Sequence, residues 1–316
     1  MKKVAVVIPN YNGIEYMDRC LKALENQKYK KFEVVIVDNG SSDESYNVKG
    51  KYKLDLNVIN LDQNYGFSVA VNTGIKATNA EYVILLNNDA FATPNFVENL
   101  VGRMDSDEKI FSAQALMLQE NRKELVDSAG DYFCAMGWGF SRGKDGLMSK
   151  YIGKANVFSS CAGAAIYRKS ILDEIGLFDE EFFAYLEDVD IGYRARLAGY
   201  KNVLVPEAMV FHVGSGSTGA RHNGFKVQIS ARNTFLVMYK NFAWWQWVLN
   251  AFPIGLGILV KYIYFSSKKM GKEYKTGIFQ YKTAKKSVTK FKAVRQSLYW
   301  KIQLELMLNC FRRLVK

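Results

Sequence analysis

The stretch that decides the fold is Val4-Ala5-Val6-Val7-Ile8-Pro9-Asn10-Tyr11-Asn12-Gly13, an apolar run that ends abruptly in polar residues. The pattern recurs twice, where residues 34–37 precede Asp38-Asn39-Gly40-Ser41 and residues 82–86 precede Asn87-Asn88-Asp89. Short β-branched runs separated by segments of helical period are typical of buried parallel strands. The three polar clusters are therefore predicted at the carboxyl ends of strands on one edge of one sheet, where open α/β sheets bind ligands.

The chemistry of this edge favours a nucleoside-diphosphate ligand. The first strand-to-helix turn lacks the glycine fingerprint of dinucleotide-binding folds, and the sequence contains no Walker A motif. Carboxylates and amides are found there instead. Asp38 can accept a hydrogen bond from a pyrimidine imide, and Asp89 can bind a divalent cation that neutralises a diphosphate.

The composition indicates a folded chain with an unusual tail. With 316 residues, 49% of them hydrophobic, the chain can bury one large core or one core plus an appendage. Its four cysteines include no C-x-x-C pair, which fits reduced thiols in a cytosolic setting. Residues 261–316 hold fifteen Lys or Arg against two Glu, a charge of +13, so the rest of the +12 chain carries −1. A nearly neutral body argues against a nucleic-acid partner, and the basic tail favours contact with an anionic surface.

Further elements are predicted from the spacing of apolar residues. Helices are expected over 15–27 and 69–77 and from Pro94 onward, and strands at 33–37, 57–59, 203–205 and 209–211. Residues 114–154 show no clear period and are interpreted as long loops over the pocket. In these loops, Trp138 is a candidate for stacking on an acceptor sugar, with an ordinary surface excursion as the equal alternative. The small residues Gly163 and Ala164 would let the backbone approach a ligand closely.

Two adjacent carboxylates, Glu187 and Asp188, are the candidate catalytic groups. They follow a run of aromatic residues and begin a predicted helix that stops at Gly199. The helix macrodipole alone would explain acids in a first turn, but adjacent carboxylates can also orient an acceptor hydroxyl and take its proton. His212 ends a predicted strand before a Gly/Ser-rich segment. A lone histidine is more often structural, yet this position also suits a metal-binding imidazole on a mobile lid.

Taken together, these motifs resemble the family 2 glycosyltransferases of GT-A fold, and within them the bacterial rhamnosyltransferase-like group. They occur in the family's order over about 240 residues. The resemblance implies an α/β protein with a mixed central sheet flanked by helices. The C-terminal helical extension and its association with a membrane are predicted from the residues of the tail itself. The matching segments are 9–13, 37–43, 64–67, 72–74, 86–89, 187–190, His212 with Ser215 and Ser217, and 232–233.

The resemblance also implies roles for individual residues. Asp188 would be the general base of an inverting transfer, with Glu187 beside it, and Asp89 and His212 would bind the metal. Asn87 stands where the family often has a first aspartate, so Mg²⁺ or Mn²⁺ would need diphosphate oxygens to complete its site. The nucleotide-binding candidates are Pro9, Asn10, Asn12, Asp38, Asn39, Ser41, Asn64, Gly66, Asn72, Asn87 and Asn88. The acceptor candidates remain Trp138, Gly163 and Ala164.

The C-terminal region is predicted to attach the protein to a membrane. Residues 241–260 carry no charge and begin with Trp244, Trp245 and Trp247. A run of about 20 apolar residues can span a bilayer. Spanning would, however, put the catalytic domain on the side opposite the basic tail, away from cytosolic nucleotide sugars. Interfacial attachment at the cytoplasmic face is therefore favoured over a true span or an oligomer core, with a catalytic domain over 1–240 and a membrane-association region over 241–316.

The favoured function is transfer of L-rhamnose from dTDP-rhamnose to a lipid-linked glycan in bacterial surface polysaccharide synthesis. A UDP-hexose or UDP-galactofuranose transferase of the same fold is one alternative. A non-catalytic sugar-nucleotide-binding membrane scaffold is an alternative of another class, and a homo-oligomer is compatible with either. The enzyme is favoured because a scaffold has no physical need for Asp38, Asp89, Glu187, Asp188 and His212 together.

Overall fold

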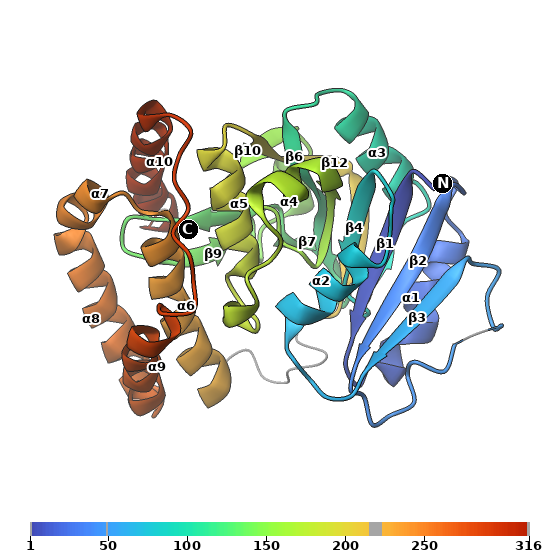
Figure 1. Cartoon of the computed structure of the whole chain (residues 1–316), viewed down its shortest axis with the longest axis horizontal. Helices are drawn as coiled ribbons and strands as arrows, with labels where there is room; N and C mark the ends of the chain where they lie inside the picture. The colour runs from blue at the N-terminus through green and yellow to red at the C-terminus, as the bar shows by residue number, and fades with distance from the viewer. Residues whose placement is uncertain (1, 49, 215–222, 315–316) are drawn as a thin grey trace.

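The computed structural model describes residues 2–48, 50–214 and 223–314 (Figure 1). The N-terminal strands lie at one end of the molecule and the C-terminal helices at the other, with the rest of the sheet between them (Figure 1). The architecture is α/β with a mixed sheet, as predicted.

Four parallel strands form the N-terminal half of the sheet. They are β1 (Val4–Asn10), β2 (Phe32–Asn39), β3 (Leu56–Leu61) and β4 (Tyr82–Leu86), in the spatial order β4-β1-β2-β3. The register sets Asn10 opposite Asp38. The prediction of a shared polar edge is therefore confirmed, because the carboxyl ends of β1, β2 and β4 point the same way.

The other half of the sheet is mixed. β11 (Ala164–Arg168) runs antiparallel to both β4 and β6 (Ile110–Gln119), and β12 (Lys201–His212) runs parallel to β6. β5 (Ala90–Ala92) and β10 (Ala155–Val157) pair with β12, and β7 (Arg122–Ser128) pairs with β6. A separate two-stranded sheet joins β8 (Asp131–Phe133) to β9 (Gly139–Ser141), and the 3₁₀ turn η1 (Met148–Lys150) follows it.

One prediction about this half of the sheet is wrong, and another is confirmed in position but with longer bounds. Residues 114–154 are not mainly loops, because they include most of the buried strand β6 and then β7, β8 and β9. Every residue of β6 is buried, so its sequence shows no alternation that would mark it as a strand. The short strands predicted at 203–205 and 209–211 are one strand, β12, whose register shifts between Val205 and Met209, around Pro206.

Helices cover both faces of the sheet. α1 (Ile14–Glu25) and α3 (Phe96–Asp105) pack on one face, and α2 (Phe67–Lys76), α4 (Lys169–Ile175) and α5 (Glu187–Leu197) pack on the other. Strand β1 serves both layers, since Val6 and Ile8 belong to the first core and Val7 to the second. The helices predicted at 15–27, 69–77 and after Pro94 are confirmed as α1, α2 and α3.

The C-terminal helices share a third core with the sheet domain. They are α6 (Gly224–Asn241), α7 (Trp244–Leu249), α8 (Ala251–Ser267), α9 (Gly271–Ala284) and α10 (Gln296–Leu314). Ile254 of α8 and Ile302 and Leu306 of α10 belong to the same buried cluster as Phe133 and Tyr193. A boundary at residue 240 would therefore fall inside α6 and divide one hydrophobic core.

The uncharged run 241–260 is divided between two helices. α7 ends before Asn250 and α8 begins after it, and Asn250 lies in a buried amide cluster with Gln246 and Gln303 of α10. The three tryptophans differ: Trp244 is exposed, whereas Trp245 stacks on Trp300 and Trp247 packs edge-on to a phenylalanine of this core. Among the residues described, no helix has both the length and the apolar character required to cross a bilayer.

A buried ion cluster fastens α5 to α6. The carboxylate of Asp190 is fully buried and accepts hydrogen bonds from Arg194 (2.9 Å), Lys240 (3.0 Å) and Asn241 (2.8 Å). The attraction of the two cations outweighs the burial that opposes its charge and lowers the pKa of Asp190. Asp190, although part of the acidic segment 187–190, therefore has a structural role.

We expect Asp190→Ala to lower the free energy of unfolding by about 3 kcal/mol, because it leaves two buried cations without their shared carboxylate. Urea denaturation followed by tryptophan fluorescence would measure the change. The matched control is Asp55→Ala, which removes an exposed carboxylate 3.9 Å from Lys2 and should cost no more than about 0.5 kcal/mol. Equal effects of the two variants would contradict the role given to Asp190.

Candidate active site

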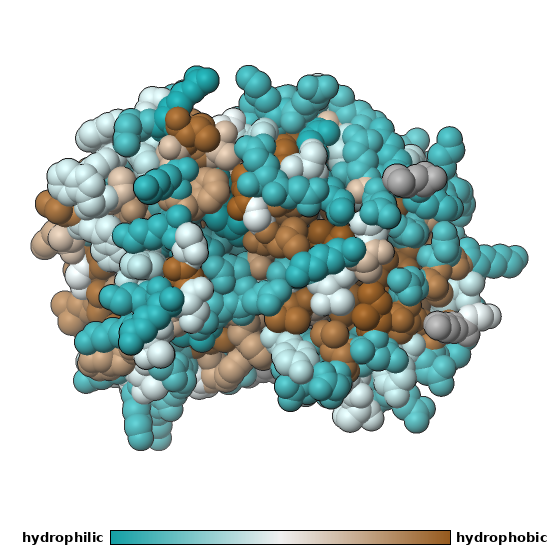
Figure 2. Space-filling model, in the orientation of Figure 1, coloured by the Kyte–Doolittle hydropathy of each residue, from teal (hydrophilic) through white to brown (hydrophobic). Residues whose placement is uncertain are grey.

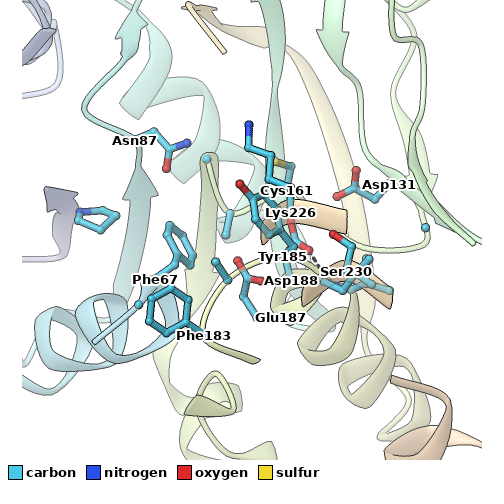
Figure 3. A pocket seen from close by; sticks show the side chains of 18 of the residues that line it. Phe67, Asn87, Asp131, Cys161, Phe183, Tyr185, Glu187, Asp188, Lys226 and Ser230 are labelled. Atoms are coloured by element: carbon cyan, nitrogen blue, oxygen red, sulfur yellow. Dashed lines mark hydrogen bonds between the residues drawn. The ribbon is translucent and has the colours of Figure 1, made fainter. Parts of the chain in front are cut away.

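A cavity of about 780 Å³ opens at the carboxyl ends of β1 and β4 (Figure 3). Its walls come from the polar ends of these strands, the segments 161–163 and 183–189, and one side of α6. In the view of Figure 3, Asn87 lies on one side and Asp131 on the other, with Glu187 and Asp188 between them. This volume is within the range of small-molecule sites in proteins.

The ends of β1 and β2 are joined by a network of amides and hydroxyls. Asn10 donates from Nδ2 to Asp38 (2.8 Å), and its Oδ1 accepts from Asn88 Nδ2 (2.8 Å). The second oxygen of Asp38 accepts from the backbone N–H of Ser41 (2.9 Å). Pro9, Asn10 and Asn88 line the cavity, whereas Asp38 is buried behind Asn10. Asn12 and Ser41 also lie outside the lining. The backbone N–H of Asn12 donates a hydrogen bond to Ser41 Oγ.

The next wall brings together Asn39, Asn64 and Gly66. Asn39 donates from Nδ2 to Asn64 Oδ1 (3.0 Å) and to the carbonyl of Gly66 (3.1 Å), and all three residues line the cavity. Gly66 has φ +91°, and a Cβ there would approach the Phe183 ring to 2.6 Å, so only glycine fits. Asn72 lies elsewhere: its amide pairs with the backbone of Phe178 in both directions (2.7 and 3.1 Å), which is a structural role.

The two predicted metal ligands meet, although they come from different strands. His212 Nε2 lies 3.2 Å from Asp89 Oδ1, and Asn87 lines the cavity beside them. On its other side, His212 Nδ1 lies 2.9 Å from Asp127, which is also paired with Lys144. Burial opposes a charge on the imidazole, but Asp127 and Asp89 outweigh it and raise the pKa of His212 to about 9. A carboxylate behind a histidine is the usual second partner of a metal-binding imidazole. A divalent cation bound by Asp89 and His212 would displace the proton that these carboxylates hold on the imidazole, because only the neutral ring is a ligand.

The candidate catalytic pair, Glu187 and Asp188, follows a strained turn. Phe183, Tyr185 and Leu186 have φ of 60°, 69° and 69°, which is unfavourable for residues with a Cβ. The Asn233 side chain holds this turn, donating to the carbonyls of residues 182, 184 and 185 (2.9, 2.9 and 2.7 Å). Directly after the turn, Glu187 and Asp188 begin α5 and line the cavity.

Burial determines the charge state of the carboxylates. It raises the pKa of Asp188 to about 6, although backbone N–H groups of residues 189 and 162 favour the ionised form. It also raises the pKa of Glu187 well above its ordinary range, with a further contribution from the charge of Asp188. Asp188 is thus ionised at neutral pH, and its proton affinity is higher than that of an ordinary aspartate.

A third carboxylate, Asp131 of β8, faces Asp188. Ligand atoms of Asp131, Cys161 and Asp188 lie within 4.8 Å of one another. Burial and the charge of Asp188 raise the pKa of Asp131 well above its ordinary value, and its Oδ2 has no hydrogen-bond partner among the described residues. This spacing could admit a cation, but burial also raises the pKa of the Cys161 thiol. A protonated thiol is a poor ligand for Mg²⁺ or Mn²⁺, so Asp89 and His212 fit these ions better.

The sequence did not indicate Asp131 or Asp127. Both lie in the segment interpreted as loops, and no motif marks them. The only local sign is Gly130, whose φ of 111° forms the turn before Asp131. The pairing strands bring Asp131 to Asp188 and Asp127 to His212 across long stretches of sequence.

The acceptor candidates are placed differently from one another. Gly163 lines the cavity and accepts a hydrogen bond from Asn87 N (2.9 Å), whereas Ala164 is buried in the core as the first residue of β11. Trp138 is not among the lining residues, and its Nε1 donates to the carbonyl of Gly257 in α8 (3.3 Å). Its neighbours Gly139 and Phe140 do line the cavity. Ser215 and Ser217 lie outside the described residues.

Comparison with known proteins agrees with this geometry. Residues 5–176 match the family described as Glycosyl transferase family 2. The chain belongs to this family and is a glycosyltransferase. A Streptococcus pneumoniae protein named Glycosyltransferase GlyA is 30% identical over 133 residues, which are 42% of this chain and 18% of the relative's length.

Three other relationships cover more of the chain. The N-acetylglucosaminyl-diphospho-decaprenol L-rhamnosyltransferase of Mycobacterium tuberculosis is 24% identical over 267 residues, 76% of this chain and 86% of that protein. The Pyrobaculum calidifontis mannosyltransferase PcManGT, solved with GDP-Man and Mn²⁺, has a TM-score of 0.57 at 14% identity and matches 89% of this chain and 87% of its own. The Staphylococcus aureus TarS fragment solved with UDP-GlcNAc has a TM-score of 0.51 at 19% identity, covering 90% and 92%. These structures show the GT-A-like fold of the glycosyltransferase.

Proposed function

We propose that the enzyme transfers L-rhamnose from dTDP-rhamnose, with inversion, to a hydroxyl of a lipid-linked glycan acceptor. The observation that carries the proposal is the carboxylate of Asp188, which is ionised at neutral pH and lies in the cavity that Asp89 and His212 also line. A nucleotide-sugar transferase of this class needs one group that takes a proton from the acceptor and another that compensates charge on the diphosphate.

Each part of the reaction has a residue that can perform it. Asn10, Asn39 and Asn88 offer amides to the nucleotide at the ends of β1, β2 and β4. A divalent cation held by Asp89 and His212 would neutralise charge on the departing diphosphate. Asp188 takes the acceptor proton as the hydroxyl attacks the anomeric carbon from the face opposite the leaving group, which inverts the configuration.

The choice of donor and acceptor rests on the mycobacterial relative. The name of that protein specifies rhamnose transfer and a diphospho-decaprenol acceptor, and it matches most of this chain. The TarS complex with UDP-GlcNAc favours the second candidate, a UDP-hexose donor, through the fold alone. The two candidates predict different nucleotides, so a donor screen separates them.

We expect Asp188→Asn to lower kcat by at least about 10²-fold while leaving donor affinity within about twofold, because an amide keeps the shape but cannot take a proton. In the unmodified enzyme, kcat/KM should fall as the pH drops below about 6, since protonation of Asp188 removes the base. Steady-state kinetics and donor titration measure both. Asp173→Asn, an exposed change on α4, is the control. A fully active Asp188→Asn enzyme would exclude Asp188 as the base.

Nucleotide release should be fastest with dTDP-rhamnose and should require Mg²⁺ or Mn²⁺. We expect chelation to abolish turnover and Asp89→Asn to weaken metal-dependent donor binding by about tenfold or more, because a carboxylate ligand is lost. A screen of dTDP- and UDP-sugars with and without metal measures this, with the exposed Asp62→Asn as control. Faster turnover of a UDP-sugar would favour the second candidate, and full activity in chelator would contradict the metal.

Asp131 is expected to position the acceptor. Burial favours the protonated form of its carboxyl, and in that form Oδ2, which has no hydrogen-bond partner among the described residues, can donate a hydrogen bond to the acceptor oxygen beside Asp188. Asp131→Ala should therefore raise the acceptor KM by about tenfold with an unchanged donor affinity, and Asp131→Asn, which keeps a donor, should restore most of it. Kinetics at varied acceptor concentration measure the difference. Equal loss in both variants, or a loss confined to donor affinity, would contradict this role.

A further inference from the structure

The C-terminal helices expose large apolar side chains on an outer surface, here called the apolar face. On α7 and α8, Trp244 and Phe252 are 79% and 80% exposed. Figure 2 shows apolar side chains along the edge of the molecule where α7 and α8 lie, with hydrophilic ones next to them. The apolar face consists of Trp244, Val248, Phe252, Leu256, Leu259 and Ile263, together with Trp300, Leu304, Leu308 and Phe311 of α10.

The spacing shows that this exposure follows the helices. Residues 252, 256, 259 and 263 recur at helical period along one side of α8, and its opposite side buries Ile254 and Gly257 against the protein. One side of α10 is likewise exposed and apolar, with residues 300, 304, 308 and 311 at helical period. On the other side of α10, Ile302 and Leu306 are buried in the third core. Stacking of Trp245 on Trp300 (4.1 Å between centroids) joins α7 to α10. Helices that are apolar on both sides need a second apolar environment.

Basic residues flank the apolar face at the far end of α8. A groove of about 530 Å³ lies between α8 and α9 and is lined by Tyr262, Ser266, Lys272, Lys275, Thr276 and Phe279. Two ammonium groups and three hydroxyls beside an apolar surface match the phosphate of a lipid headgroup above its acyl chains. A second copy of the chain would instead bring one lysine-rich margin close to another, which costs electrostatic energy.

We infer that the apolar face and its lysine groove bind an anionic phospholipid surface and hold the enzyme on the cytoplasmic leaflet without crossing it. The apolar side chains enter the interface between headgroups and acyl chains, and Lys272 and Lys275 contact headgroup phosphates. The attachment has one part that salt screens and one part that it does not.

The same helix also reaches the active site. Lys261 of α8 lines the cavity of the candidate active site. Trp138 donates a hydrogen bond to the carbonyl of Gly257 in α8, and the next residue in the sequence, Gly139, lines the same cavity. A membrane-bound enzyme would therefore present its cavity close to the lipid surface. This last step rests on the proposed lipid-linked acceptor, whereas lipid binding itself does not.

Vesicle binding by the full chain tests the inference. Vesicles of phosphatidylcholine with and without about 30 mol% phosphatidylglycerol are used in flotation assays at low and high salt. We expect binding to the anionic vesicles, and only partial release by salt. Trp244→Ser with Phe252→Ser should weaken binding at least about tenfold at both salt concentrations. Leu147→Ser with Ile152→Ser, exposed residues beside η1, is the matched control and should have no effect.

Charge reversal tests the groove separately. Lys272→Glu with Lys275→Glu should weaken binding about tenfold or more at low salt and much less at high salt. Lys28→Glu with Lys30→Glu, exposed at the other end of the molecule, is the control. Turnover of a water-soluble acceptor should be unchanged in every variant, so loss of lipid binding is distinguishable from failure of the proposed reaction.

Three results would overturn the inference. The first is the absence of vesicle binding by the unmodified chain. The second is a dimer in sedimentation velocity that the Trp244/Phe252 double variant dissociates, with no lipid binding, which would make the apolar face a contact between copies. The third is protection of residues 241–316 from protease on the far side of sealed vesicles, which would show that the tail crosses the bilayer.

Discussion

One buried carboxylate, Asp190, connects the catalytic helix to the C-terminal helices. Two cations and an amide surround it, and they come from both α5 and α6. Because the cluster is buried, separating the two helices would leave Asp190 and Lys240 as charges without each other inside the protein, which is costly in a medium of low dielectric. The first turn of α5, which carries Asp188, therefore has a fixed position relative to α6, and α6 in turn packs against α9.

The buried carboxylates near the start of α5 are of two kinds, which differ in their surroundings. Cations pair with Asp190 and lower its pKa, whereas burial is the main cause that raises the pKa of Asp131, Glu187 and Asp188. Among these three, Asp188 accepts backbone hydrogen bonds that favour its ionised form, which suits its proposed role as the base. The strained turn over 183–186 presents this group to the cavity, and Asn233 holds the turn in place.

The sequence predicted the parts of the site that depend on local pattern. The strand ends at Asn10, Asn39 and Asn87 and the acidic start of α5 were found because buried strands and helix starts have clear signatures. Other features arise only from tertiary pairing. Asp131 and Asp127 reach the site through β7 and β8, in a region with no period, and Asn72 pairs with the backbone of Phe178 although it lies in a family motif.

The close approach of α8 to the cavity wall has a geometric consequence. A methyl group at Gly257 would lie 2.4 Å from the carbonyl oxygen of Met136, so α8 rests on the 134–138 turn with no spare room. The fold therefore fixes the distance between the outer side of α8 and the carboxylate of Asp188. If the proposed membrane attachment holds α8 on a bilayer, this fixed separation would set the height of the reacting hydroxyl above the lipid and would favour acceptors that extend that far from the surface.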